Sequence, residues 1–445
     1  MRMTQGHGPF PSQWTKGEST RRTIALFSLL GSLVATSVGA QFDQYTAPGG
    51  LGVGEVSTKE SIEKSVANAP WHLGKVRFQP YIGVKDVGYV QNLLGNEGRP
   101  IKDVTATLGL GLKGYLPVGP KVVVAAHFLP EYSWWQKSVD LRGWHLRSGV
   151  GAYGFFNHLT LELKATGTDL LDYVSTEFDS PATVKSTDVG LDARIDLYGP
   201  WALYVGGTYL DTAYDDKGVE NVFGNQIEAL DRTEKVGRLG ASYTLSNGFR
   251  TTVGGQWSQT DFSDRRDRSN DGMGPFLAVS FVGTHWGASA DISRYDLKPA
   301  NAGSTFVPFT ATAGKVRLNW SSTSRLGAGV YAGRQLVYSL AVGSSYFVDQ
   351  RAGLSLSYTM GWRTQLQGFV EKGDSRYESA PGSNYNRQDD YTGYGATFQF
   401  KATETTTLII GFARQIIDSN LPGATRTLTT LRLNLNLGSG LLSPW

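Results

Sequence analysis

The 445-residue chain contains no cysteine, so neither a disulfide framework nor a thiolate metal site can form. It also has no apolar run long enough for a comfortable transmembrane helix, and runs of helix-favouring residues are scarce. The mean hydropathy is slightly negative, which excludes a bundle of transmembrane helices. No proline- or serine-rich linker divides the chain after its N-terminal region, so one large folding unit is expected.

A strong excess of one charge is also missing. The formal net charge is +3, and residues 1–40 carry four basic residues and one acidic residue. The rest of the chain therefore holds 38 residues of each sign, which argues against a nucleic-acid-binding protein. No zinc-like spacing is found among the six histidines, and we expect neither a metal nor a cofactor. These histidines are His7, His72, His127, His145, His158 and His285.

What the chain does have is alternation of apolar and polar residues, seen most clearly near its C-terminus in residues 427–437. The apolar parity there consists of Leu431, Leu433, Leu435 and Leu437, and the polar parity of Arg432, Asn434 and Asn436. Successive side chains of a strand point to opposite faces, so this strand is expected to separate an apolar phase from water. The alternative is a soluble barrel with the leucine faces inside, but about 18 strands would leave a large void at its centre.

The same alternation returns along nearly the whole chain from residue 73, with short and long connections in turn. Short turns are expected near 117–120, 156–157, 199–200, 247–248, 283–284, 322–324, 361–362 and 403–405. Long loops are expected at 92–102, 137–143, 171–185, 214–232, 263–272, 298–309, 340–350, 379–390 and 418–426. The pattern predicts an all-β fold, a transmembrane antiparallel up-and-down β-barrel of about 18 strands (16 to 20), with short periplasmic turns and long extracellular loops.

Three segments are expected along the chain. Residues 1–40 have the pattern of a signal peptide, with Arg21-Arg22, a short apolar stretch and small residues that favour cleavage after Ala40. An uncleaved anchor and a twin-arginine signal are the alternatives. Residues 41–72 form a periplasmic N-terminal segment with a short helix, because 57–60 is a capping box and Ile62 and Val66 lie four apart. This helix either lines the barrel mouth or lies against its rim. The third segment, residues 73–445, forms the outer-membrane barrel.

Basic residues recur on the polar parity. The set expected to line the pore is Lys75, Arg77, Lys113, Arg147, Lys164, Arg194, Arg250, Lys315, Arg317, Lys401 and Arg432. An arginine facing lipid at the bilayer midplane costs about 2–4 kcal/mol, so this parity must point inward. A basic pore concentrates anions and disfavours cations. The alternative is that the charges only solvate the interior and pair with carboxylates such as Glu162, Asp192, Asp196 and Asp291.

Other motifs are weaker. Aromatic residues near strand ends, including Tyr132 to Trp135, Trp144, Trp201 and Trp286, favour interfacial girdles over sugar stacking. Residues 267–272 resemble half of a calcium loop, but Ala278 stands where a bidentate glutamate is needed. A GxGxxG pattern at 109–114 lies within a predicted strand and lacks the strand-to-helix turn of a dinucleotide site. No specific catalytic arrangement accompanies His127 and His145, so we expect no enzyme.

The first predicted strand carries a resemblance. Residues 73–78 (Leu-Gly-Lys-Val-Arg-Phe) and 88–92 (Gly-Tyr-Val-Gln-Asn) resemble the first strand of an outer-membrane β-barrel porin family associated with bacterial exopolysaccharide systems. Lys75 stands for that family's proline, and Val90-Gln91 for its Asp-Ser. The resemblance implies a channel through which polysaccharide leaves the cell.

The residues and the resemblance together predict an outer-membrane channel of a Gram-negative bacterium, either a passive porin or the exit pore for secretion of a polysaccharide, which a basic lumen suggests is anionic. The expected partners are outer-membrane lipid and lipopolysaccharide, the barrel-assembly machinery, and polysaccharide or periplasmic export components, with no nucleic acid. A structural or adhesin-like surface barrel with a closed pore and an outer-membrane barrel enzyme are the two alternatives.

Overall fold

A computed structural model describes residues 58–91, 101–175, 177–215, 227–245, 248–322, 325–341, 343–403 and 405–438. The predicted signal peptide, its cleavage site and residues 41–57 lie outside these ranges. The chain begins with helix α3 (Thr58–Asn68) and the short strand β1 (Trp71–Leu73). The barrel strands are β2 (Val76–Gln91), β3 (Lys102–Val118), β4 (Val122–Trp135), β5 (Gly143–Phe155), β6 (Leu159–Ser175), β7 (Phe178–Asp196), β8 (Trp201–Asp215), β9 (Arg232–Thr244), β10 (Phe249–Phe262), β11 (Asn270–Val282), β12 (Trp286–Pro299), β13 (Phe309–Ser321), β14 (Leu326–Tyr338), β15 (Ser344–Met360), β16 (Thr364–Ser379), β17 (Gln388–Lys401), β18 (Thr406–Ser419) and β19 (Arg426–Gly438).

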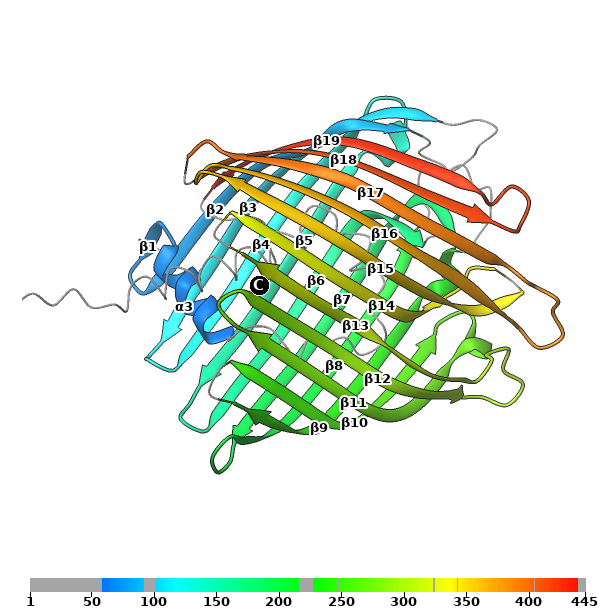
Figure 1. The fold of residues 1–445 in the computed structure, drawn as a ribbon, viewed down its shortest axis with the longest axis horizontal. Coiled ribbons are helices and arrows are strands. Elements are labelled where there is room, and N and C mark those ends of the chain that lie inside the picture. Colours follow the sequence, from blue (N-terminus) through cyan, green and yellow to red (C-terminus); the bar gives the residue numbers. More distant parts are fainter. Residues whose placement is uncertain are drawn as a thin grey trace, which may run out of the picture.

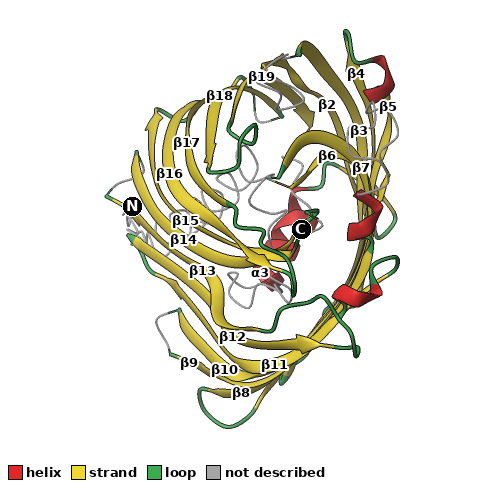
Figure 2. Ribbon diagram, turned by 90° about the vertical axis from the view of Figure 1, so that its right-hand side faces the viewer, coloured by secondary structure: helices red, strands yellow, loops and turns green. Residues whose placement is uncertain are grey.

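The strands form one closed antiparallel sheet. Each barrel strand pairs with its neighbours in sequence, and β19 pairs with β2, from Thr429 opposite Gln91 to Gly438 opposite Tyr81. Within the described residues this gives a barrel of 18 strands, with β1 added beside the start of β2. The tilted strands are seen from the side in Figure 1 and surround the interior in Figure 2. The predicted fold class is confirmed.

Exposure alternates along the strands as the sequence predicts. On β3, Leu110 and Leu112 are 47% and 43% exposed, whereas Thr105 and Thr107 are buried. On β19, Leu431 is 51% exposed, and Arg432 on the opposite face is half-buried. Because the outer face is apolar while the inner face is polar, the barrel has the surface of a protein embedded in the outer membrane.

Among the helices of the described residues, none has the length and apolarity needed to cross a membrane.

Most aromatic residues near strand ends face outward. Trp134, Trp144, Trp201 and Trp286 are all exposed, and the Tyr132 ring lies 5.3 Å from that of Trp144. Trp135 departs from the predicted girdle because it is on the inner parity of β4. It packs there in a buried cluster with Val90, Leu141 and Leu428.

Two predicted loops are largely strand. Residues 171–185 belong mostly to the β6–β7 hairpin, whose strands pair from Leu159 opposite Ile195 to Ser175 opposite Phe178. Residues 344–350 of the predicted loop 340–350 belong to β15. Polar residues are typical both of a loop and of a strand that continues beyond the bilayer. Alternation is therefore lost where both strand faces leave lipid, although the ladder continues.

A β-bulge interrupts the first barrel strand. Asp86 has a left-handed backbone (φ 53°), and the register of β2 shifts between Lys85 and Gly88. Its amide donates to the Asn434 side-chain oxygen at 2.7 Å. The extra residue reverses which parity faces inward, so Val90 is buried whereas Tyr89 is exposed. The alternation predicted from residue 73 onward therefore changes face beyond Lys85.

Helix α3 lies inside the ring of strands at the end that carries the short turns (Figure 2). Its Ile62 is 2% exposed, and Ile62, Val66 and Ala69 share a packed cluster with inward-facing wall residues. These wall residues are Tyr115, Val123, Ala125, Tyr153 and Phe155 of β3, β4 and β5. Of the two placements predicted from the sequence, the helix takes the one that lines the mouth.

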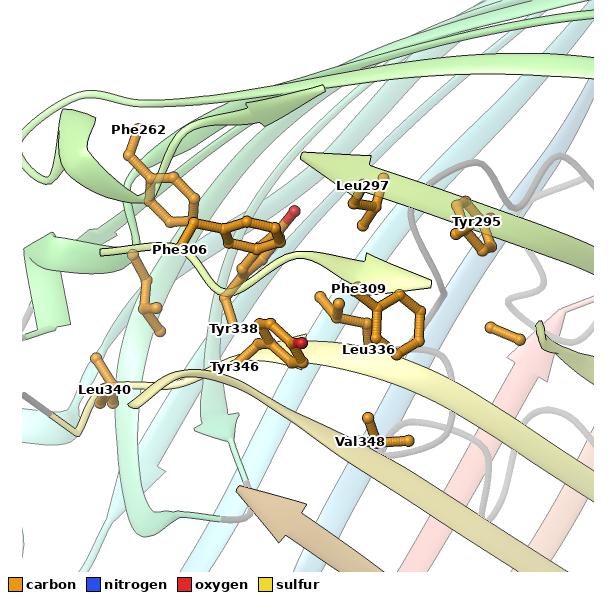
Figure 3. Close-up of a cluster of buried hydrophobic side chains, with 12 residues drawn as sticks. Phe262, Tyr295, Leu297, Phe306, Phe309, Leu336, Tyr338, Leu340, Tyr346 and Val348 are labelled. Carbon is orange, nitrogen blue, oxygen red and sulfur yellow. The ribbon is translucent and has the colours of Figure 1, made fainter. Parts of the chain in front are cut away.

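The opposite end of the barrel contains the largest buried apolar cluster, drawn in Figure 3. Phe306, from the β12–β13 loop, is 1% exposed and packs beside Tyr346 of β15, with ring centroids 5.3 Å apart. Phe262 contacts Tyr338 edge-on at 4.9 Å. These contacts hold the long loops against the inner wall, so the loop end is packed and not open coil.

Candidate channel interior

Ten of the eleven predicted pore residues lie within barrel strands, and nine of these ten are partly buried. These nine are Lys113, Arg147, Lys164, Arg194, Arg250, Lys315, Arg317, Lys401 and Arg432. Their neighbours on the strand are on the outward parity: Val316 and Leu318, for example, flank Arg317 and are 44% and 42% exposed. The two others are at the short-turn end, where Lys75 is in the turn between β1 and β2 and Arg77 is the second residue of β2, both exposed. Neither is in the middle of the lumen.

Many of the charges on the inner wall are paired with carboxylates. The nitrogen-to-oxygen distances are 2.6 Å for Lys85–Glu131, 3.0 Å for Lys164–Glu162, 3.0 Å for Arg194–Asp196, 2.7 Å for Arg232–Glu234, 2.9 Å for Arg238–Asp291, 3.0 Å for Arg351–Asp349 and 3.4 Å for Arg432–Asp86. Several of these pairs join residues two apart on the same strand face. Reading the interior as simply basic therefore overlooks the carboxylates of Glu131, Glu234 and Asp349.

Two glycines of β3 lie beside the Lys85–Glu131 pair and its neighbour Leu129. Lys85 on β2 reaches Glu131 on β4 across the intervening strand, where Gly109 faces inward. A Cβ on Gly109 would lie 3.5 Å from Cγ of Glu131, and a Cβ on Gly111 would lie 2.2 Å from Cδ2 of Leu129. The GxGxxG pattern at 109–114 is thus part of a strand over which neighbouring side chains pack closely.

A smaller group of cations remains without a carboxylate. Within the ranges that the structure describes, Arg147, Arg250 and Arg317 form no ion pair, and the Nε atoms of Arg147 and Arg250 have no hydrogen-bond partner. Arg147 lies on β5 near His127, which is opposite Lys113 on the β3–β4 ladder. These side chains leave part of the wall positively charged.

Tyrosines and carboxylates form a second kind of contact around the wall. The hydroxyl of Tyr204 donates to Asp192 at 2.5 Å, while Tyr331 and Tyr391 donate to the two oxygens of Glu371 at 3.0 and 2.5 Å. Glu371 is 5% exposed and joins residues of β14, β16 and β17. These hydrogen bonds fix inward-facing side chains that water would otherwise leave mobile.

The loop end of the lumen is crossed by a contact centred on Glu177, between β6 and β7. Its carboxylate accepts hydrogen bonds from the Ser339 hydroxyl and the Leu340 amide, both at 2.6 Å. Arg426, at the start of β19, donates to its carbonyl oxygen at 2.5 Å. Because β6–β7 and β14–β15 are nearly opposite around the ring, this contact connects distant parts of the wall.

Arginines surround this contact. Arg268, 1% exposed, donates to the carbonyl oxygens of Ser339 at 2.5 Å and Ala341 at 3.1 Å. Burial lowers the pKa of the Arg268 guanidinium to about 10, which still leaves it charged at neutral pH. Burial raises the pKa of Glu177, opposed by hydrogen bonds from Leu340 and Ser339 and by the charges of Arg387 and Arg268. Sequence reasoning missed Glu177, because it falls in a segment predicted to be a solvated loop.

Among the described residues, no group of three or more histidine, aspartate or glutamate side chains is placed to hold a metal ion. In the calcium-like stretch, the carboxylate of Asp267 is hydrogen-bonded by Arg265 at 3.1 Å and Thr305 at 2.5 Å. The Arg265 bond contributes most to a pKa of about 2 for Asp267. In the described part of the chain, no hydrogen bond joins His145 to a serine.

No protein-family model matches this chain. A search of curated proteins likewise gives no match. Solved structures with a similar architecture include OccAB3 of Acinetobacter baumannii, at 12% identity and TM-score 0.48, covering 81% of this chain and 98% of that one. They also include the outer membrane protein OpdK of Pseudomonas aeruginosa, at 11% identity and TM-score 0.47, covering 83% and 99%. A bacterial polysaccharide outer membrane secretin aligns at 10% identity and TM-score 0.35, covering 82% and 99%. The closed ring and the apolar outer rows of this chain identify it as an outer-membrane β-barrel.

Proposed function

We propose that the protein is an outer-membrane channel that prefers anionic solutes and has no enzymatic activity. The observation that carries this proposal is a closed ring of 18 strands whose inner face is polar and charged along its length. A polar inner face is solvated when water fills the lumen, and a barrel of this strand number leaves room for a channel. Helix α3 and the loop end narrow the two mouths.

Anion preference is supported by the charges that remain uncompensated. Arg147, Arg250 and Arg317 face inward on three well-separated strands and make no ion pair within the described residues. The ion pairs elsewhere on the wall are close to neutral, and the carboxylates of Asp192 and Glu371 accept hydrogen bonds from tyrosines. A few unpaired cations in a confined aqueous path raise the local anion concentration.

The experiment is a reversal-potential measurement on the purified chain in a planar bilayer under a KCl gradient. We expect discrete conductance and a reversal potential of the sign given by chloride preference. Arg147→Ala is expected to reduce that preference, whereas Arg376→Ala, which removes an exposed charge paired with Asp374, should leave it unchanged. Potassium preference in the unmodified channel contradicts the anion proposal, and a lack of conductance contradicts the channel.

The cargo that the sequence resemblance implies is a polysaccharide, and we propose secretion of an acidic one as the physiological role, with passive diffusion of small anions as the competing role. The inward tyrosines and carboxylates supply hydrogen-bonding groups of the kind that hydroxyl-rich chains use. An acidic oligosaccharide that interrupts the ion current in a length-dependent manner supports the polysaccharide role. Small anions that pass while oligomers never enter support diffusion.

A closed structural barrel is the second candidate, favoured by the Glu177 contact across the loop end and by α3 in the other mouth. The same bilayer recordings separate it from a channel, because a barrel closed at both ends gives no steady current. Binding to lipopolysaccharide and to export components is part of the proposal and is tested by co-purification from native membranes.

A further inference from the structure

The site that holds Glu177 is built as a receptor for a carboxylate. One oxygen accepts from the Ser339 hydroxyl and the other from the Leu340 amide, both at 2.6 Å. Such bonds from neutral donors are strengthened when the acceptor is ionised and water is excluded, and Glu177 is only 4% exposed. The two donors belong to the β14–β15 connection, whereas the carboxylate comes from the β6–β7 hairpin.

The receptor half of this contact contains arginines and is held in place by bonds that do not involve Glu177. Arg268 binds the carbonyl oxygens of Ser339 and Ala341, which orients the segment that supplies both donors. Arg387 is fixed by Asp389 at 2.7 Å and stacks over the Tyr377 ring with its guanidinium 4.8 Å from the ring centroid. Removal of Glu177 would therefore leave a preformed group of donors beside the charges of Arg268, Arg387 and Arg426.

The hairpin that delivers Glu177 extends beyond the ladders of its neighbouring strands. Pairing of β6 with β5 ends at Asp169 opposite Leu146, and pairing of β7 with β8 ends at Thr183 opposite Asp215. Among the described residues of 170–175 and 177–182, the ladder partners are consequently within the hairpin itself. A unit with few ladder bonds to its surroundings opens at a lower free-energy cost than one paired on both sides, and the bonds of Glu177 to Ser339, Leu340 and Arg426 oppose that opening.

We propose that the Ser339–Leu340 segment, with Arg268, is a binding site for the carboxylate of an anionic solute and that Glu177 occupies it as an internal competitor. The inference rests on the proposed channel function, because a solute must enter the lumen to reach the site. A bound solute carboxylate displaces the hairpin tip, and departure of the solute lets the tip return.

The test measures block of KCl current by glucuronate in the full chain reconstituted in planar bilayers, with glucose as the neutral analogue. In Glu177→Ala and in the isosteric Glu177→Gln, the internal competitor has lost its charge. We expect glucuronate to block half of the current at a concentration at least about tenfold lower than in the unmodified channel, a difference of about 1.4 kcal/mol. Glucose should not block the unmodified channel or either Glu177 variant.

Glu162→Ala is the matched control, because it removes a carboxylate paired with Lys164 on the wall and leaves the receptor intact. Glucuronate should block half of the current through Glu162→Ala at the same concentration as in the unmodified channel. Retention of the heat-modifiable folded band on gels confirms that each variant is a barrel. Equal glucuronate block in the unmodified channel and both Glu177 variants overturns the inference, as does equal block by glucose. A lack of current in every channel overturns the proposed function instead.

Discussion

At the scale of single residues, the inner wall is organised by contacts between a carboxylate and a cation or a tyrosine on neighbouring strands. The sequence shows which residues share a strand face, so pairs two apart, such as Arg194 with Asp196, could be anticipated. Pairs between strands distant in sequence could not, because they depend on register. Arg238 of β9 meets Asp291 of β12 across two strands, and only the assembled ring brings them together.

This cross-strand pair gives the first prediction. Asp291→Ala removes the carboxylate that holds the Arg238 side chain, which is only 3% exposed, at 2.9 and 3.3 Å. We expect a loss of about 1.5–3 kcal/mol in the free energy of unfolding, the usual value of hydrogen bonds to a charged group. Urea unfolding in lipid vesicles provides the measurement.

Asp296→Ala is the control on the same strand, since Asp296 pairs with Lys298 at 3.2 Å on the solvated surface. It should change the unfolding free energy little. If both variants lose the same stability, the inner pair has no special structural role.

At the scale of elements, the sequence predicts helix α3 but does not determine where the helix lies relative to the barrel. The four-residue spacing of Ile62 and Val66 predicts an amphipathic helix, but a helix on the rim and a helix in the mouth require the same apolar face. The structure distinguishes them because the partners of this face are inward wall residues, including Tyr115 and Tyr153. Strand ends beyond the bilayer were missed for a similar reason: residues 171–185 keep the ladder after the apolar signal ends.

The second prediction concerns the docking of α3. Ile62→Ala removes most of a side chain that is 2% exposed, and a truncation of this kind costs about 2–5 kcal/mol where the cavity stays unfilled. We expect faster hydrogen exchange throughout 58–68 and a larger single-channel conductance, with little change in the strands.

Glu63, the exposed residue next to Ile62, provides the control for the α3 variant. Glu63→Gln alters a side chain whose ion-pair partner among the described residues is Lys59, at 3.8 Å on the helix surface. It should leave both hydrogen exchange and conductance as they are. A protected helix and unchanged conductance in Ile62→Ala would show that the helix is not held by this apolar face.

At the scale of the whole molecule, closure of the ring explains why local alternation was sufficient to predict the architecture. Each strand only has to place apolar side chains on lipid and polar ones in water, and the pairing of β19 with β2 leaves no free edge. The bulge at Asp86 shows the limit of this reasoning, because one inserted residue reverses the faces without altering the composition of the strand.

The third prediction compares the lipid-facing and the lumen-facing side of β13 at two of its residues. Val316 is 44% exposed on the outer face, and Val316→Arg should reduce the unfolding free energy by about 2–4 kcal/mol in a bilayer. Asn319→Arg adds the same side chain to the inner face and should cost much less. Denaturant titration in vesicles compares them, and equal losses would be inconsistent with a water-filled interior.

The most direct test uses the absence of cysteine. Single cysteines placed in turn along β19, from Leu431 to Leu437, are reacted with a membrane-impermeant thiol reagent in reconstituted vesicles. The account predicts modification at 432, 434 and 436 and protection at 431, 433, 435 and 437. Uniform reactivity along the strand, or reaction at the leucine positions with protection at Arg432, Asn434 and Asn436, would contradict an aqueous lumen enclosed by a lipid-facing wall.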